Sequence, residues 1–191
     1  MNNPWENIFG WFTYSFYYEH IVKISNSNSK FVEVGSFMGR STCCMAHYIK
    51  ESGKDIEFFA VDHWKGSEEH LEHFSDIDLF LTFEKHLKDK DLYQYVKPIK
   101  MDSLEASKLF DDESIDFVHL DASHDYESCI SDIKSWYPKV KKGGIISGDD
   151  FNLCHFPGVV KAVYECFCGK PVYLLNNPQE IGCIWSLEKD E

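Results

Sequence analysis

Residues 31–42 form the segment that most constrains how this chain can fold. They read Phe-Val-Glu-Val-Gly-Ser-Phe-Met-Gly-Arg-Ser-Thr, an apolar strand that runs into a glycine turn and then into a helix. Gly35 permits a tight turn and a close approach to a ligand, and Gly39 lets the helix pack close to the strand. The first N–H groups of that helix can bind an anion. The segment therefore predicts the start of a nucleotide-binding α/β fold.

A second apolar strand, near residues 57–61, ends at Asp62. Dinucleotide-binding folds carry a ribose-binding acid close to this position. The glycines of the first turn, however, follow the spacing Gly-x-x-x-Gly rather than Gly-x-Gly-x-x-Gly. This spacing argues against a pyrophosphate-bearing dinucleotide, and so against a nicotinamide-dependent oxidoreductase. It favours a smaller adenosyl ligand.

Short apolar strands alternate with helical stretches along the rest of the chain, which is typical of a parallel α/β sheet. A length of 191 residues suits one domain with a full core. We therefore expect a single Rossmann-like domain over residues 1–191, with a mostly parallel seven-stranded sheet, helices on both faces and one antiparallel strand near the C-terminus. The strands are predicted near residues 31–34, 57–61, 96–100, 115–121, 144–147, 172–175 and 182–187, with a hairpin joining the last two.

Two further segments stand out. Acidic residues interrupt the apolar run of residues 1–30 before it reaches bilayer length, which argues against a transmembrane helix. We therefore interpret residues 1–30 as an N-terminal aromatic helix that packs on the sheet or on a second subunit of a homo-oligomer. Residues 63–95 form a long charged connection, interpreted as a solvated helix or a lid. Because it leaves the carboxyl end of the second strand, we expect it to cover the active site. Its histidines lack the paired spacing of a zinc site; they are His63, His70, His73 and His86.

Charge and cysteine content limit the function classes. The formal net charge of −13 would repel phosphate backbones, so we expect no nucleic acid as partner. An interfacial membrane helix near the N-terminus is the alternative to a packed one, but the lack of Lys or Arg on its polar face weighs against it, so we expect no membrane partner. Seven cysteines, an odd number in a chain without a secretory leader, indicate free thiols in a reducing compartment. The chain is therefore expected in the cytoplasm.

Three acids follow predicted strands, Asp121 after the fourth and both Asp149 and Asp150 after the fifth. A parallel sheet would bring them together at one edge. Clustered carboxylates repel one another unless they are protonated or bridged by a cation, and an all-oxygen cluster suits Mg²⁺, Mn²⁺ or Ca²⁺. The alternative is that each acid caps a following helix or turn.

Four segments together resemble the class I S-adenosylmethionine-dependent methyltransferases, in which Glu-x-Gly-x-x-x-Gly opens the fold. The residues are Glu33 to Gly39, Val61 to Gly66, His119 to Glu127 and Gly143 to Asp150, and the last three look like the branch of macrocin O-methyltransferase and cephalosporin hydroxylase-like proteins. The resemblance implies methyl transfer from S-adenosylmethionine to a hydroxyl of a sugar or small natural-product molecule, assisted by a divalent metal. The alternative is an adenosyl-binding protein without turnover.

The resemblance also implies roles for individual residues. Asp121, Asp149 and Asp150 would bind Mg²⁺ or another divalent cation, and His124 would act as the general base, with Asp125 or Tyr126 as alternatives. An imidazole suits that role because its pKa of about 6.5 lets it accept a proton near neutral pH.

The cofactor pocket follows from the same resemblance. The methionine end of S-adenosylmethionine would contact the loop after the first strand, and its ribose would contact the acid of the second strand. Its adenine would lie beside the residues that follow the third strand. Trp64 either closes over the site or is buried structure. The predicted cofactor-binding residues are Glu33, Gly35, Ser36, Gly39, Asp62, His63, Met101, Asp102, Ser103 and Asp121.

Overall fold

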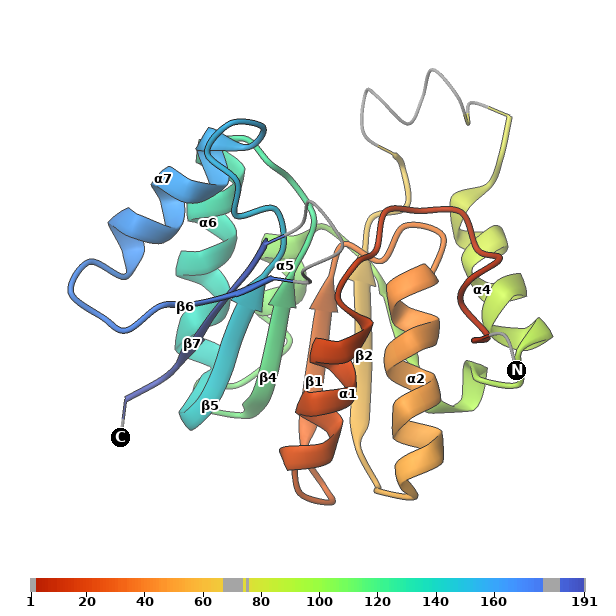
Figure 1. The fold of residues 1–191 in the computed structure, drawn as a ribbon. Coiled ribbons are helices and arrows are strands. Elements are labelled where there is room, and N and C mark those ends of the chain that lie inside the picture. Colours follow the sequence, from red (N-terminus) through yellow and green to blue (C-terminus); the bar gives the residue numbers. More distant parts are fainter. Residues whose placement is uncertain (1–2, 67–73, 75, 177–182, 191) are drawn as a thin grey trace.

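A seven-stranded sheet in the order β3-β2-β1-β4-β5-β7-β6 forms the centre of the molecule (Figure 1). The computed structural model describes residues 3–66, 74, 76–176 and 183–190. β7 runs antiparallel to both of its neighbours and the other strand pairs are parallel, as predicted. The predicted hairpin before β7 lies mostly outside the described residues. The strands are β1 (Lys30–Val34), β2 (Glu57–Asp62), β3 (Lys97–Lys100), β4 (Ile115–Leu120), β5 (Val140–Gly148), β6 (Tyr173–Asn176) and β7 (Cys183–Glu188).

Helices cover both faces of the sheet, because successive strand residues point to opposite sides. In β1, Phe31 packs in the cluster formed with α1, α2 and α4, whereas Val32 and Val34 pack in the cluster formed with α5, α6 and α7. Both faces are therefore apolar, which explains the continuous hydrophobic runs of the central strands. The helices are α1 (Ser15–Ile24), α2 (Arg40–Ser52), α4 (Leu79–Asp89), α5 (Ser103–Ser107), α6 (Tyr126–Trp136) and α7 (Pro157–Cys166), with 3-10 turns η1 (Tyr93–Tyr95) and η2 (Tyr137–Lys139).

The N-terminal aromatic helix is shorter than residues 1–30. It is α1, Ser15–Ile24, and the preceding residues form turns across the top of the molecule (Figure 1). Gly10, at φ +144°, bends this segment, and its carbonyl accepts a hydrogen bond from Arg40. At the other end of α1, Lys54 donates to the carbonyls of Val22, Lys23 and Ser25 at 2.6–2.9 Å, which holds the helix against the sheet.

The second half of the predicted lid, residues 63–95, contains the helix α4, which packs on the core. There, Leu79, Phe83 and Leu87 are spaced four residues apart on α4 and are all buried in the core. Asp78 caps this helix by accepting from the N–H of Leu81 at 3.0 Å. Residues 67–73 and 75, including His70 and His73, lie outside the described residues.

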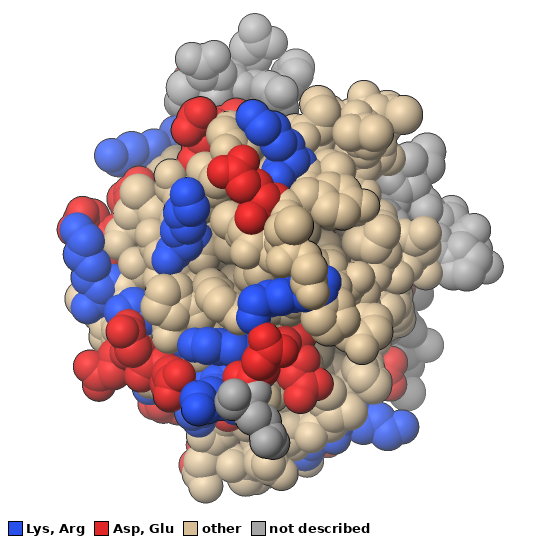
Figure 2. Space-filling model, turned by 90° about the vertical axis from the view of Figure 1, so that its left-hand side faces the viewer, with Lys and Arg blue, Asp and Glu red and all other residues tan. Residues whose placement is uncertain are grey.

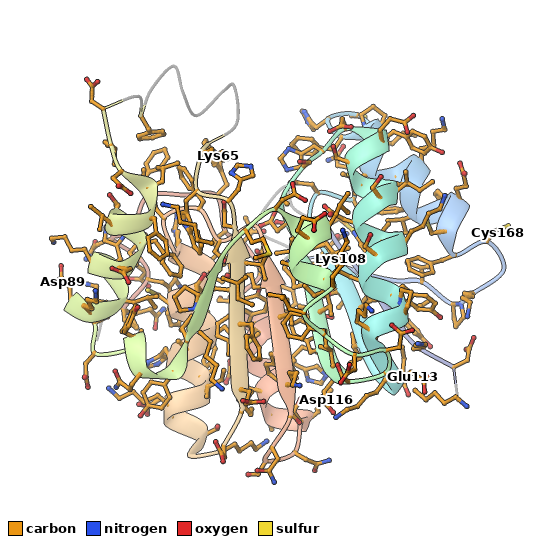
Figure 3. The ribbon with its side chains drawn as sticks, turned by 180° about the vertical axis from the view of Figure 1, so that it is seen from behind. Lys65, Asp89, Lys108, Glu113, Asp116 and Cys168 are labelled. Atoms are coloured by element: carbon orange, nitrogen blue, oxygen red, sulfur yellow. The ribbon has the colours of Figure 1, made fainter. Side chains whose placement is uncertain are left out.

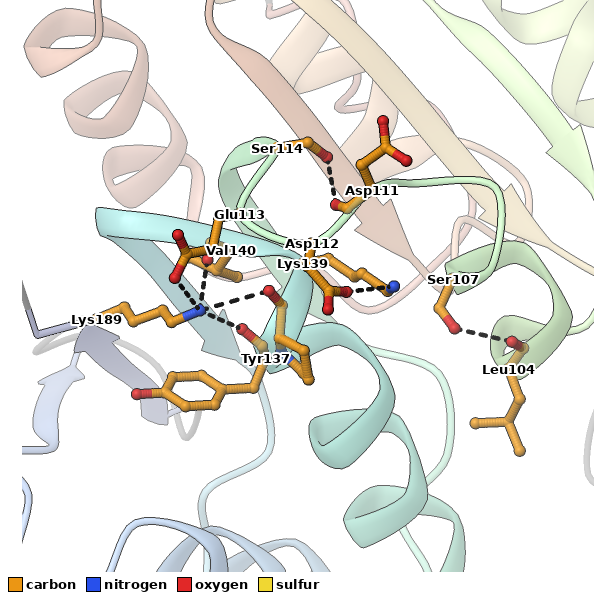
Figure 4. A network of polar contacts seen from close by, with 11 residues as sticks. Leu104, Ser107, Asp111, Asp112, Glu113, Ser114, Tyr137, Lys139, Val140 and Lys189 are labelled. Atoms are coloured by element: carbon orange, nitrogen blue, oxygen red, sulfur yellow. Dashed lines mark hydrogen bonds and ion pairs between the residues drawn. The ribbon is translucent and has the colours of Figure 1, made fainter.

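β5 begins four residues earlier than expected, at Val140. Its pairing with β4 changes register, because Ile115 pairs with Val140 and Phe117 with Ile145, and Gly143 at φ +70° lies among the extra residues of β5. Here Lys189 donates to the Val140 carbonyl at 2.8 Å and lies 3.8 Å from the Glu113 carboxylate (Figure 4). This network fixes the end of β7 at the edge of the sheet where β4 and β5 begin.

The carboxyl ends of the parallel strands share the opposite edge, at the top of Figure 1. Seen from behind, Lys65, just past β2, lies at this edge, and Asp116, near the start of β4, lies at the other (Figure 3). Open α/β sheets bind ligands outside the carboxyl ends of their strands. Most of the predicted site residues lie at or just after the ends of β1, β2, β3, β4 and β5, on this side of the sheet.

The surface is mixed in charge on the side that faces the viewer in Figure 2, where Lys and Arg alternate with Asp and Glu. In the described part of the chain, no helix combines the length and the apolar character needed to cross a bilayer. All seven cysteines are free thiols, as the odd cysteine count predicts.

Candidate active site

The loop after β1 turns at Gly35, which has φ +95°. A Cβ at this position would overlap the carbonyl oxygen of Asp121. The same two loops are joined by the bond from the Asp121 N–H to the Val34 carbonyl, at 2.8 Å. Gly35 is therefore required by the close approach of the β1 and β4 loops as well as by its backbone conformation.

Gly39 ends this loop as the N-cap of α2, at φ +87°. A Cβ here would lie 2.9 Å from the ring of Phe83 in α4. The residue that crowds Gly39 thus comes from the neighbouring helix α4.

Glu33 is buried beneath the loop, where its oxygens accept hydrogen bonds from three hydroxyls. Tyr18 and Ser36 donate to it at 2.9 Å, and Thr42 also donates. Burial raises the pKa of Glu33, while these hydrogen bonds lower it. Glu33 therefore ties β1 to α1, to the loop and to α2.

Asp62 holds the same loop from the end of β2. One oxygen accepts from the backbone N–H groups of Ser36 and Phe37 at 3.1 and 2.8 Å, and the other accepts from the N–H of Trp64 at 2.6 Å. A carboxylate has about four acceptor positions, so one remains for a further donor. His63, half exposed, lies 3.7 Å from this carboxylate.

Trp64 is a buried side chain of the core, the second of the two alternatives that the sequence left open. Its ring packs on Phe80 and Phe83 of α4 with centroids 4.7 and 4.8 Å apart. Its indole N–H donates to the Phe37 carbonyl at 2.7 Å. Trp64 therefore connects the glycine loop to α4.

The three residues after β3 occupy different surroundings. Met101 is partly exposed, and its N–H donates to the Asp62 carbonyl at 2.9 Å. Asp102 caps α5 through the N–H of Leu104 at 2.9 Å. The Ser103 hydroxyl points toward α6, where it donates to Asp132 at 2.5 Å. Met101 therefore lies beside the end of β2 and Asp102 lies on the surface, whereas the side chain of Ser103 is bonded to α6.

Asp121, His124 and Asp150 come together where β4 and β5 end. One potential ligand atom from each lies within 4.8 Å of the others. His124 Nε2 is 2.7 Å from Asp150 Oδ2, and Asp150 adopts φ +60°. The cluster of closely placed ligand atoms thus contains His124 where the sequence suggested Asp149.

Asp149 lies beside this cluster and interacts with it through charge. Burial and repulsion from Asp150 raise the pKa of Asp149 to about 7, and burial and repulsion from both neighbouring acids raise the pKa of Asp121 well above its usual value. Asp149 Oδ1 is buried without a hydrogen-bond partner among the described residues. The adjoining cavity of about 20 Å³ has room for one water or ion.

The alternative that these acids are helix caps is wrong for the helices that follow them. Asp125 caps α6 by accepting from the Ser128 N–H at 3.0 Å, and α7 begins after Phe156 without a side-chain cap. The two alternative bases are also engaged elsewhere, since the Tyr126 hydroxyl donates to Glu165 at 2.6 Å. His124 is the residue among these three that contacts the acids.

Sequence reasoning missed one member of the site, Tyr14. Its hydroxyl donates to Asp121 Oδ2 at 2.8 Å across 107 positions of the chain. Burial and the charge of Asp121 raise the pKa of this phenol well above its usual value, so it stays protonated and acts as a donor. The aromatic run near the N-terminus gave no signal that distinguished Tyr14 from its neighbours.

A methyltransferase domain family matches residues 32–151. The match spans more than half of the chain, and the chain therefore belongs to this family. The matched segment contains every site residue predicted from the sequence, whereas Tyr14 precedes it.

Two curated relatives have sequences similar to this one, and both are described as uncharacterized. Protein R132 of Acanthamoeba polyphaga mimivirus is 27% identical over 190 residues, 93% of this chain and 79% of that protein. Protein y4gI of Sinorhizobium fredii is 25% identical over 117 residues, 61% of this chain. This chain spans 12% of the length of y4gI.

Solved methyltransferases share the fold. The S-adenosylmethionine-dependent O-methyltransferase TM0748 from Thermotoga maritima has a TM-score of 0.68 at 14% identity, covering 100% of this chain and 72% of that one. The O-methyltransferase NovP has a TM-score of 0.70 at 17% identity, covering 92% of this chain and 79% of that one. The chain is thus a methyltransferase domain with the fold of S-adenosylmethionine-dependent enzymes.

Proposed function

We propose that this chain transfers a methyl group from S-adenosylmethionine to a hydroxyl oxygen of a small molecule, a sugar or natural product of the kind accepted by the macrocin O-methyltransferase branch. The observation that carries the proposal is the meeting of Asp121, His124 and Asp150 within 4.8 Å, directly beside the Gly35 loop. The net charge of −13 favours a small acceptor over a nucleic acid.

The acids fit a divalent cation. Asp121, Asp149 and Asp150 would hold it. Two observations support this set: Asp149 Oδ1 has no hydrogen-bond partner among the described residues, and the pKa values of Asp121 and Asp149 are raised, as expected for clustered carboxylates without a bridging cation. Carboxylate oxygens suit Mg²⁺ or Mn²⁺. When bound, the cation would favour the ionised form of the acceptor hydroxyl.

His124 would take the proton of that hydroxyl. In the overall reaction an O–C bond forms, the C–S bond of the sulfonium breaks, and the proton passes to the imidazole. Asp150, 2.7 Å from His124 Nε2, would stabilise the imidazolium that results. S-Adenosylmethionine supplies the methyl group and a neutral thioether leaving group.

The cofactor would lie over the β1 loop. Asp62 would accept from a ribose hydroxyl with its remaining lone pair while it holds the N–H groups of Ser36 and Phe37. Glu33 supports the same loop from below. The chain's work is therefore to orient the two reactants and to hold the proton acceptor.

Calorimetry with S-adenosylhomocysteine, followed by methyl-transfer assays on a panel of hydroxylated acceptors, tests the proposal. We expect cofactor binding, and activity that is abolished by exhaustive chelation and restored by Mg²⁺ or Mn²⁺. Full activity after chelation would refute the metal assignment. Binding without transfer to any acceptor would support a binding protein, and tight binding of a nicotinamide dinucleotide alone would support an oxidoreductase.

A further inference from the structure

We propose that Tyr14 is a positioning residue for Asp121, holding one carboxylate oxygen so that Asp121 faces the cation site in one orientation. The inference rests on the cation site of the proposed function. It adds a residue from outside the matched family segment, since that segment begins at residue 32.

The contact is well defined. The Tyr14 hydroxyl donates to Asp121 Oδ2 at 2.8 Å, and Tyr14 has no exposed surface. Tyr14 directly precedes α1, so the bond links the start of that helix to the end of β4. A hydrogen bond to a buried carboxylate is among the stronger polar contacts in proteins.

Three aromatic side chains hold the Tyr14 ring in place. The Phe12 and His119 rings lie 4.6 Å from it between centroids, and the Tyr18 ring lies at 5.1 Å. Phe12 and Tyr18 meet it edge to face, at 77° and 75°. The hydroxyl therefore has a fixed position, which is what a group that orients a metal ligand needs.

The main chain of Asp121 is fixed independently of Tyr14. Its N–H donates to the Val34 carbonyl at 2.8 Å, and its own carbonyl contacts Gly35. What remains variable is the rotation of the Asp121 carboxylate. Tyr14 occupies one acceptor position of Oδ2, which leaves the other lone pairs of the carboxylate for a cation.

Tyr17, in the first turn of the helix that Tyr14 precedes, provides a matched control. It is also buried, and its hydroxyl shares a 2.9 Å hydrogen bond with the hydroxyl of Ser186 rather than with a carboxylate. Tyr14→Phe and Tyr17→Phe each remove one buried hydroxyl and keep the ring. A loss that arises from general weakening of α1 would affect both variants equally, whereas a positioning role would affect Tyr14→Phe alone.

The experiment is a calorimetric Mn²⁺ titration of the wild type and both variants at one pH, with circular dichroism and thermal unfolding as folding checks. We expect Tyr14→Phe to bind Mn²⁺ roughly 10- to 100-fold more weakly, the usual effect of removing a partner of a metal ligand. Tyr17→Phe should keep the wild-type affinity, and both variants should bind S-adenosylhomocysteine as the wild type does.

Equal Mn²⁺ affinity in the wild type and Tyr14→Phe would overturn the inference and leave the proposed function intact. Equal losses in the two variants would also overturn it, because they would reflect packing. If the wild type itself does not bind Mn²⁺, both the inference and the metal assignment of the proposed function fail.

Discussion

The imidazole of His124 lies 2.7 Å from the carboxylate of Asp150, measured from Nε2 to Oδ2. The pair stands at the junction of β4 and β5, so the group proposed to take a proton is in contact with a group proposed to bind a cation. A ring of Phe156, with its centroid 4.6 Å away, packs against the same imidazole. The two roles, base and ligand, can be separated by measurement.

His124→Ala should lower the turnover rate by roughly 10²- to 10⁴-fold, as expected for loss of a general base, and leave S-adenosylmethionine affinity nearly unchanged. His20→Ala, at an exposed position of α1, is the matched control and should keep full rate. The deciding measurement is Mn²⁺ affinity. If His124→Ala loses metal binding together with rate, His124 is a ligand and another group is the base.

Asp62→Ala should weaken S-adenosylmethionine binding by roughly 1.5–3 kcal/mol, because it removes a charge-assisted acceptor and releases the N–H groups of Ser36 and Phe37. Calorimetry measures this loss. Asp78→Ala is the control, since Asp78 also accepts a backbone N–H but caps α4. It should cost about 1 kcal/mol of stability and no cofactor affinity. Equal affinity losses in the two variants would contradict a cofactor role for Asp62.

In the absence of metal, the contribution of Asp149 to the free energy of unfolding should fall as the pH rises from about 4 to about 7. The pKa of Asp149 is about 7 in the folded chain, against about 3.9 for an unfolded aspartate. Between these values the folded state binds more protons than the unfolded state, so the free energy of unfolding falls with pH.

Thermal unfolding at pH 5 and pH 8 in the presence of a chelator measures this dependence. Asp149→Asn should reduce the pH-dependent loss, and Mn²⁺ at pH 8 should restore stability to the wild type but less to the variant. His119, buried with its pKa lowered to about 3, contributes the opposite slope equally to both proteins and therefore cancels. An identical pH dependence in the two proteins would show that Asp149 is not the group responsible.

Gly35→Ala should destabilise the fold by several kcal/mol and abolish cofactor binding, because its Cβ would overlap the Asp121 carbonyl. Gly53→Ala is the matched control. Gly53 also has positive φ, at +65°, but nothing lies within 4 Å of the position that a Cβ would take there, so the variant should cost about 1 kcal/mol. Urea unfolding of both variants separates the clash from the backbone strain, and similar values would argue against the close approach of the two loops.

Much of the fold was predictable from local sequence. Apolar runs place β1, β2 and β4 within one residue of their observed bounds, because strands buried on both faces leave a continuous hydrophobic signal. β5 was underestimated because its first residues include Lys141, Lys142 and Gly143, which read as the end of a helix. The spacing of Leu79, Phe83 and Leu87 carried a helix signal that the charged residues around it obscured.

The part of the candidate site that lies at the ends of strands was predictable from the sequence. Asp121 and Asp150 meet because β4 and β5 are parallel neighbours, and that pairing follows from the fold class. The contacts of Tyr14 and Ser103 depend on how the helices pack against the sheet and against one another. Tyr14 reaches Asp121 across 107 positions, and Ser103 reaches Asp132 across 29, so neither partner could be assigned from spacing.

The position of β7 has a consequence for synthesis of the chain. Of the seven strands of this sheet, β7 is the last to be synthesised, yet it lies between β5 and β6. Until it arrives, the edge of β5 that pairs with residues 185–188 offers unpaired backbone groups right next to Asp149. A nascent chain that has completed β6 therefore carries an open strand edge beside its acids, and the pairing of β7 with β5 closes that edge.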